Sequence, residues 1–208
     1  MNRIAIIGAG DMGQQIAHMG AVNGYSIAGF FDDYHNTGCV VAELPVLGST
    51  GDIITKKDKF DGIVIGIGYK HFNVRKKLYE WLVAENIHIQ TIIDKRAIVD
   101  ETAEVGDGSI VMNNVILDKG VRIGANVFVN IGSTIAHDSF IGNHSFVAPR
   151  VAIAGFTRIG ECNFLGINST VIDNITTADN VFIGGGGVVT KSIEEEGLYV
   201  GVPVRRIR

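Results

Sequence analysis

The stretch VNIGSTIAHDSFIGNHSF, residues 129–146, decides the fold of the second half of this chain. It consists of three six-residue units, each beginning with Val or Ile and carrying Ser four positions later. The same step of six runs from Val99 to Val189 through sixteen positions, and all but Thr177 are Val, Ile or Leu. This period is the hexapeptide repeat of a parallel β-helix. Three hexads form one triangular coil of eighteen residues, so the repeat predicts about five coils.

Each position of the hexad predicts a role in the coil. The aliphatic residue points inward, and the small residue four positions later lets the next coil stack. Gly or Asn often follows the aliphatic residue directly, as at Gly106, Gly124 and Asn130, and we expect this position to take the permissive backbone conformation of a corner. No insertion breaks the phase, so we expect no long loop between the coils.

The first 95 residues show a different periodicity, in which short apolar runs alternate with helical patterns. Gly24 stands where a helix C-cap is expected. The predicted strands are residues 3–8, 26–31, 62–68 and 88–93, and the predicted helices are residues 14–22 and 74–86. The expected fold class is therefore an α/β Rossmann-like domain over residues 1–95, followed by a β-helix domain over residues 96–208.

Composition narrows the class of protein. The chain has 27 Gly and only 3 Pro among 208 residues, which favours a turn-dense structure. A net charge of −4 argues against nucleic acid or an anionic membrane as the main partner. No run of 18 apolar residues occurs, and Gly8 interrupts the N-terminal stretch before a secretory signal could develop. Cys39 and Cys162 form no CxxC motif, so we expect a soluble, cytoplasmic protein.

The motif GAGDMG, residues 8–13, lies between the first predicted strand and helix and is typical of a turn that cradles phosphate. Asp32 follows Gly10 by 22 residues, which fits a carboxylate that hydrogen-bonds a ribose hydroxyl. Taken alone, this spacing indicates NAD, so a nicotinamide-dependent oxidoreductase is one alternative. The domain is, however, short for a full dinucleotide fold, and no hydride-transfer domain follows it.

Together these motifs resemble a known family, the bacterial nucleotide-sugar acetyltransferases of the hexapeptide-repeat superfamily. The resemblance covers almost the whole chain and rests on the hexads and on GAGDMG, Phe31-Asp32-Asp33, Ile67-Gly68, Arg75-Lys76-Lys77, Ala136-His137-Asp138 and Gly201-Val202-Pro203. Members acetylate UDP-4-amino-sugars in bacillosamine-type pathways, and close relatives O-acetylate sialic acid. The resemblance implies a left-handed β-helix, acetyl-CoA as co-substrate, no metal and a homotrimer.

For catalysis, the resemblance singles out His137 and Asp138. Neutral imidazole is suited to taking a proton from an attacking amine near pH 7. At a corner, the Asp138 carboxylate could reach Nδ1 of the ring and raise its basicity. The resemblance also implies that the Gly155 amide faces the acetyl carbonyl and that the backbones of Ile167 and Gly185 contact the CoA arm.

One position departs from the family, which has a second His where this chain has Phe146. Either Phe146 replaces a polar contact to acetyl-CoA by a packing one, or His144 substitutes, although we expect His144 to be exposed. Arg205, Arg206 and Arg208 form either a solvated tail or a contact to the 3′-phosphate of CoA.

In the N-terminal domain, the resemblance implies a UDP-sugar site. The residues expected at the sugar and phosphates are Gly10, Asp11 and Met12, those near the uridine are Asp32 and Asp33, and Gly68 closes over the ligand. His35, His71 and His88 show no metal-ligand spacing with the cysteines, so no metal site is predicted.

We therefore expect an acetyl-CoA-dependent N-acetyltransferase acting on a UDP-4-amino-sugar. Three alternatives remain: a sialic acid O-acetyltransferase with the same base and donor, the oxidoreductase, and a non-catalytic scaffold that binds sugar nucleotides.

Overall fold

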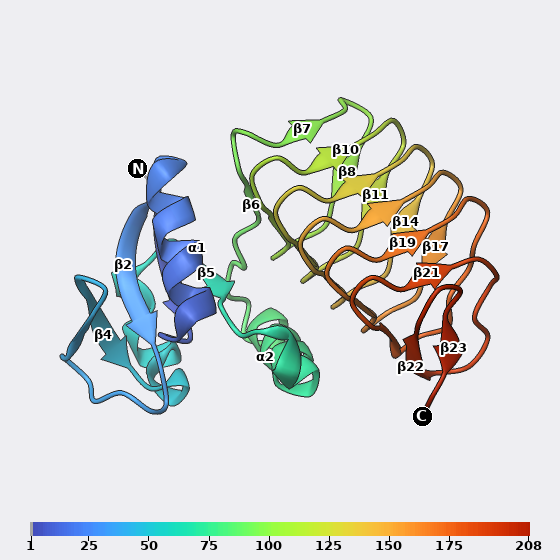
Figure 1. The fold of residues 1–208 in the computed structure, drawn as a ribbon. Helices are drawn as coiled ribbons and strands as arrows, with labels where there is room; N and C mark the ends of the chain where they lie inside the picture. The colour runs from blue at the N-terminus through green and yellow to red at the C-terminus, as the bar shows by residue number, and fades with distance from the viewer. Residues whose placement is uncertain (1) are drawn as a thin grey trace. The chain divides into compact units, whose positions relative to one another are not determined.

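The computed structural model describes residues 2–208 and divides the chain into two compact units, one ending at Gln90 and the other running from Thr91 to Arg208 (Figure 1). Within the described residues, no helix has the length and apolar character needed to cross a membrane.

The first unit is built on a five-stranded sheet with the strand order β3-β4-β2-β1-β5. All neighbouring strands are parallel except the β3–β4 pair. Its elements are β1 (Arg3–Ile7), α1 (Asp11–Val22), β2 (Ser26–Phe31), β3 (Val40–Val41), β4 (Leu44–Gly48), the 3-10 helices η1 (Thr50–Asp52) and η2 (Ile54–Lys59), β5 (Gly62–Ile65), the 3-10 helix η3 (Tyr69–His71) and α2 (Phe72–Ala84). Strands β1 and β5 are apolar and almost fully buried, as expected for parallel strands covered on both faces.

The sequence predicts this unit with two errors. The hairpin of β3 and β4 was not predicted, and the expected strand over residues 88–93 does not form. Only Ile89 makes a bridge to β5, while Ile92 and Ile93 pair within the second unit. Both helices begin two or three residues earlier than expected.

The second unit is a stack of coils whose strands form three sheets, parallel except for the last two strands of the chain, and Figure 1 shows it running from green to red. One sheet contains β7 (Ile98–Val99), β10 (Ile116–Leu117), β13 (Thr134–Ile135), β16 (Ala152–Ile153), β19 (Thr170–Val171) and β21 (Val188–Val189). A second contains β8 (Glu104–Val105), β11 (Arg122–Ile123), β14 (Phe140–Ile141) and β17 (Arg158–Ile159). The third contains β6 (Ile92–Ile93), β9 (Ile110–Val111), β12 (Phe128–Val129), β15 (Phe146–Val147), β18 (Phe164–Leu165), β20 (Val181–Ile183), β22 (Gly197–Val200) and β23 (Arg205–Arg206).

The strand register confirms the hexapeptide coil. Ile135 pairs with Leu117 on one side and Ile153 on the other, eighteen residues away in each direction. From Val111 to Val189 the residue at the inward position is at most 4% exposed, and each such aliphatic side chain contributes on the order of 1.5–3 kcal/mol by burial. Thr177, the exception in the repeat, is also buried, and its hydroxyl accepts a hydrogen bond from the Asn163 amide at 2.6 Å.

The serines of the repeat link one coil to the next. The Ser133 hydroxyl donates to the Ala148 carbonyl oxygen at 3.0 Å and accepts the Val151 N–H at 3.2 Å. This satisfies polar groups that the stack buries, which explains why Ser is favoured here over other small residues.

The corner conformation differs from the expectation. A positive φ occurs three residues after the inward aliphatic residue, for example at Asn126, Gly132 and Asp138, rather than directly after it. Glycine directly after the aliphatic residue has another cause: a Cβ on Gly142 would lie 2.5 Å from the backbone of Gly160 on the next coil. These glycines therefore permit close stacking of coils.

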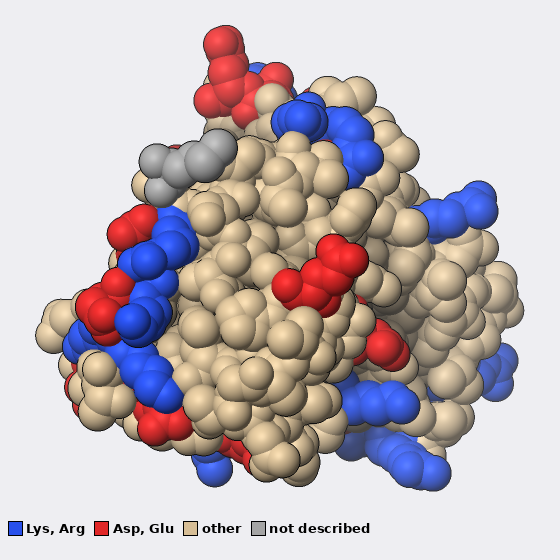
Figure 2. Space-filling model, turned by 90° about the vertical axis from the view of Figure 1, so that its left-hand side faces the viewer, with Lys and Arg blue, Asp and Glu red and all other residues tan. Residues whose placement is uncertain are grey.

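Charges of both signs are interspersed on the face in Figure 2, where a band of Lys and Arg runs beside Asp and Glu along one side and much of the rest is uncharged. Among the charged residues of the N-terminal unit, Lys56 pairs with Asp52 and Lys59 pairs with Asp58. This face therefore presents no broad field of a single sign of the kind a polyanion would require.

Candidate active site and ligand cavity

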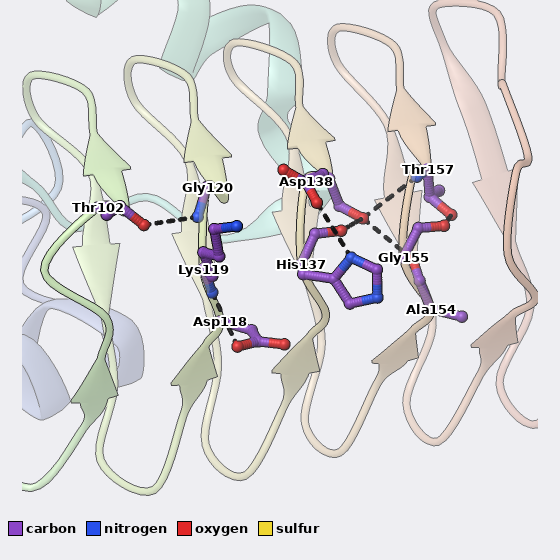
Figure 3. A network of polar contacts seen from close by, with 10 residues as sticks. Thr102, Asp118, Lys119, Gly120, His137, Asp138, Ala154, Gly155 and Thr157 are labelled. Carbon is purple, nitrogen blue, oxygen red and sulfur yellow. Dashed lines mark hydrogen bonds and ion pairs between the residues drawn. The ribbon is translucent and has the colours of Figure 1, made fainter.

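His137 and Asp138 occupy the corner between β13 and β14. The imidazole Nδ1 lies 3.1 Å from Oδ2 of Asp138, and both side chains are about half exposed (Figure 3). Asp138 adopts a φ of 56°, and its backbone N–H donates to the Lys119 carbonyl oxygen on the preceding coil at 2.9 Å. The left-handed corner turns the Asp138 carboxylate back toward its neighbour, so two consecutive residues form an orientated His–carboxylate pair that leaves Nε2 for a substrate.

Glycines of the two neighbouring coils enclose this pair. A Cβ on Gly155 would lie 2.7 Å from Cε1 and 2.8 Å from Nε2 of His137. A Cβ on Gly120 would lie 2.8 Å from Oδ1 of Asp138. Figure 3 shows the ring of His137 extending along the edge of the stack toward Gly155. The ring can lie here only because position 155 has no side chain.

The backbone amide of Gly155 forms no hydrogen bond with any acceptor in residues 2–208. At the corresponding position two coils earlier, the Lys119 N–H is satisfied by Oδ1 of Asp118 at 2.8 Å. Ala154 precedes Gly155 and offers no such acceptor. An N–H left open close to the imidazole is chemically suited to stabilising an oxyanion.

Phe156 completes this corner and was not predicted from the sequence. Its ring meets the His137 ring edge to face, with centroids 5.0 Å apart and an interplanar angle of 87°. Its side chain is 55% exposed. The available signal was its position in the hexad, eighteen residues after Asp138, where the repeat otherwise favours small or polar residues.

Ile167 and Gly185 lie on a different corner from His137, at the opposite edge of the six-stranded sheet. They are eighteen residues apart on successive coils, and a Cβ on Gly185 would lie 3.1 Å from Cγ2 of Ile167. The outer face of the sheet between the two corners carries a groove of about 330 Å³. The residues lining it are Thr134, Ala152, Ile153, Ala154, Thr170, Val171, Ile172 and Asp173. A ligand that contacts both corners has to cross this face.

The structure corrects the two expectations for Phe146 and His144. The Phe146 ring is 2% exposed and stacks between Phe128 and Phe164, with centroid distances of 4.9 and 6.0 Å. It therefore belongs to an aromatic ladder and has no surface to offer to acetyl-CoA. His144 is also buried rather than exposed, and its Nδ1 lies 3.0 Å from Nδ2 of Asn126 at a third corner.

The N-terminal unit contains a cavity of about 440 Å³ at the carboxyl ends of β1, β2 and β5. All six residues predicted to bind substrate line it: Gly10, Asp11, Met12, Asp32, Asp33 and Gly68. The glycine motif shapes its floor, because a Cβ on Gly13 would lie 1.8 Å from the Gly8 carbonyl oxygen. Tyr34, which is 96% exposed, and His35 add ring groups to the lining.

Asp32 organises this cavity from within. One carboxylate oxygen accepts the Ala9 N–H at 2.8 Å, and the other accepts the N–H groups of Tyr34 and His35 and lies 2.8 Å from Nδ1 of His35. Burial alone would raise the pKa of Asp32, but the hydrogen bonds from Ala9, the His35 side chain and the Tyr34 backbone outweigh burial and lower it. One oxygen thus fixes the glycine turn and the other fixes the loop that follows β2, whereas the spacing suggested a free acceptor for a ribose hydroxyl.

Asp33 is similarly engaged, since its carboxylate accepts the N–H and hydroxyl of Thr50 at 2.8 and 2.9 Å. At the C-terminus, Arg205 and Arg206 line a cavity of about 550 Å³ together with Lys191, and Arg206 forms an ion pair with Glu195. Across residues 2–208, no group of three or more His, Cys, Asp or Glu side chains is placed to hold a metal ion.

Comparison with known proteins shows which proteins this chain resembles. Residues 3–82 match the PglD N-terminal domain family. The resemblance to nucleotide-sugar N-acetyltransferases of the hexapeptide-repeat superfamily, expected from the sequence, is confirmed by this match and by the relatives described next.

Among solved structures, the acetyltransferase domain of PglB from Neisseria gonorrhoeae is similar over all of both chains, with a TM-score of 0.91 and 26% identity. PerB from Caulobacter crescentus, solved with CoA and GDP-perosamine, gives a TM-score of 0.92 at 25% identity over all of this chain and 98% of its own. The UDP-3-O-acylglucosamine N-acyltransferase of Bordetella pertussis is 35% identical over 102 residues, which are 47% of this chain. The match covers only 28% of that curated relative.

Proposed function

We propose that this protein is an acetyltransferase that moves the acetyl group of acetyl-CoA to the amine of a nucleotide-linked amino sugar. The observation that carries the proposal is the His137–Asp138 pair enclosed between Gly120 and Gly155, with the Gly155 amide left open. Relatives of similar fold support it, since PerB was solved with CoA and a nucleotide sugar and PglB with acetyl-CoA.

In the proposed reaction, His137 Nε2 removes a proton from the sugar amine as the nitrogen attacks the thioester carbonyl carbon. Asp138 holds the ring through Nδ1 and stabilises the imidazolium that forms. The Gly155 N–H stabilises the oxyanion of the tetrahedral intermediate. The C–S bond then breaks, and the imidazolium returns its proton to the leaving thiolate, which gives the amide and free CoA.

The binding sites follow from the two units taken separately. In the N-terminal unit, a Rossmann-like fold, the cavity beside Gly10, Asp11, Met12 and Gly68 receives the nucleotide sugar, with the base toward Asp33. In the second unit, a left-handed β-helix, acetyl-CoA lies across the outer face of the six-stranded sheet, from the backbone of Ile167 and Gly185 toward His137. By resemblance, three copies assemble, and a neighbouring copy completes the acetyl-CoA site.

The test is thiol release from acetyl-CoA with a panel of acceptors. The panel contains UDP- and GDP-linked 4-amino-sugars, the same sugars without the amine, and sialic acid. We expect turnover only with an amino sugar, and a loss of about 10²- to 10⁴-fold in His137→Asn, which keeps an uncharged polar side chain but removes the base.

Each of the other possible results of this assay would support one of the alternative functions. Release with sialic acid alone would support O-acetylation at the same site. If no acceptor gives thiol release, and NADH but neither UDP nor GDP raises the thermal midpoint, the oxidoreductase would be supported. If no acceptor gives thiol release but UDP or GDP raises the thermal midpoint, a scaffold that binds sugar nucleotides would be supported.

A further inference from the structure

Phe156 stands at the left-handed position of the hexad, which most coils fill with Gly, Asn or Asp and three corners fill with His144, Arg150 and Cys162. It adopts a φ of 58°, in the left-handed region that Gly, Asn and Asp enter most readily. The other left-handed residues of the same corner are Gly120, Asp138 and Asn174, on the coils before and after it. A phenylalanine here strains the backbone. Burial of its ring does not offset the free-energy cost of this strain, because the side chain remains 55% exposed. Backbone strain of this kind clusters at active sites and ligand contacts, which makes Phe156 a candidate for a functional role.

The contact that Phe156 makes is with the imidazole of His137. The two rings meet at 87° with centroids 5.0 Å apart, and the Phe156 N–H donates to the His137 carbonyl oxygen at 3.1 Å. Asp138 holds Nδ1 of the same ring, and Gly155 leaves space beneath it. The ring contact with Phe156 and the Nδ1 contact with Asp138 together restrict rotation of the imidazole.

The exposed part of the Phe156 ring is an apolar surface directly beside the base. An aromatic ring offers a flat surface against which the C–H groups of a pyranose can pack, while the sugar hydroxyls stay in water. Building on the proposed transfer reaction, we infer that Phe156 positions His137 and serves as the platform for the sugar ring of the acceptor. It would thereby determine which sugars present their amine to Nε2.

Three substitutions separate this role from a structural one. Phe156→Asn places at this corner the residue that the next coil carries as Asn174, so the backbone strain is relieved while the ring is lost. Phe156→Leu keeps an apolar side chain without an aromatic face. Phe156→Tyr keeps the ring and serves as the conservative rescue.

We expect Phe156→Asn to raise KM for the amino sugar at least tenfold and to lower kcat, while KM for acetyl-CoA changes less than twofold. Its thermal midpoint should equal or exceed that of the wild type. Phe156→Leu should be intermediate, and Phe156→Tyr should restore the wild-type parameters. A role confined to folding would lower the thermal midpoint and leave the KM for the sugar unchanged.

Two results would overturn the inference while the transfer reaction stands: a Phe156→Asn variant whose sugar KM stays within twofold of the wild type, or one whose molecular mass in solution differs, which would assign the ring to a contact between copies. If the wild type transfers to no acceptor, the platform fails together with the proposed function. The positioning role is then judged in the resting protein by NMR. The ring-proton resonances of His137, assigned by their loss in His137→Asn, should shift in Phe156→Asn, and unmoved resonances would refute it.

Discussion

Gly155→Ala tests the geometry of the proposed active site most directly. The added Cβ would lie 2.7 Å from Cε1 of His137, about 0.7 Å short of the 3.4 Å at which ordinary contact begins. The imidazole, not the backbone, has to move, because it is the end of a side chain that is about half exposed. A displacement approaching 1 Å in a catalytic group costs up to about 10²-fold in rate, equivalent to roughly 2.7 kcal/mol in the activation barrier.

The assay is kcat for thiol release, measured beside thermal unfolding. We expect kcat to fall by about 10- to 10²-fold while the free energy of unfolding changes by less than about 1 kcal/mol. The matched control is Gly155→Ala combined with His137→Ala. With the ring gone, the added methyl should cost nothing further in stability, because the two residues act as one coupled pair. A Gly155→Ala enzyme with wild-type kcat would show that the ring does not rest where the structure places it, and would refute the reasoning.

Three further predictions follow from the same contacts. Asp138→Asn should lower kcat by about 10- to 10²-fold in the thiol-release assay with little change in thermal midpoint, because it removes the charge that stabilises the imidazolium; wild-type kcat would exclude this role. Asp32→Asn should cost about 1–3 kcal/mol in urea unfolding at pH 7. The lowered pKa of Asp32 means that its contribution is present above the ordinary value of 3.8 and is lost as pH falls through the folded pKa, so the difference from the wild type should shrink in acid and a constant difference would contradict it. Gly142→Ala should cost about 1–3 kcal/mol in the same assay because its Cβ meets the Gly160 backbone, and an unchanged midpoint would disprove the tight stacking.

The fold of the second unit was predictable because the six-residue repeat of aliphatic side chains is compatible with few backbone arrangements. A residue that recurs every six positions can be buried throughout only if the chain closes into a coil, and Val111 to Val189 follow that rule. The position of the hexad that takes the left-handed corner conformation was harder to predict from the sequence. Gly and Asn occur both directly after the aliphatic residue and three positions after it, for two different physical reasons, and only φ values separate close stacking at Gly142 from the left-handed turn at Asn126.

The N-terminal unit shows where pattern reasoning fails. Ile89 and Ile92 lie in one predicted strand, yet Ile89 bridges to β5 and Ile92 enters the coil, since nothing in this stretch of sequence marks a domain boundary. Asp32 lines the predicted cavity, but its hydrogen bonds to the protein were not predicted. Spacing locates a carboxylate near a ligand, but hydrogen bonds from Ala9 and His35 are set by the three-dimensional path of the loop.

The candidate active site arises where several deviations from a regular repeat coincide at one corner. Most left-handed positions of this coil carry a small or polar residue, and at one equivalent corner Oδ1 of Asp118 accepts the N–H of Lys119. At the corner of His137, alanine replaces that acceptor, glycine opens space for the ring on the next coil, and Phe156 occupies the strained position instead of Asn or Gly. Each deviation alone weakens the stack or leaves it unchanged. Together they place an orientated His–carboxylate pair, an open N–H donor and an apolar surface at one edge, and the proposed acyl transfer to a sugar amine rests on this combination.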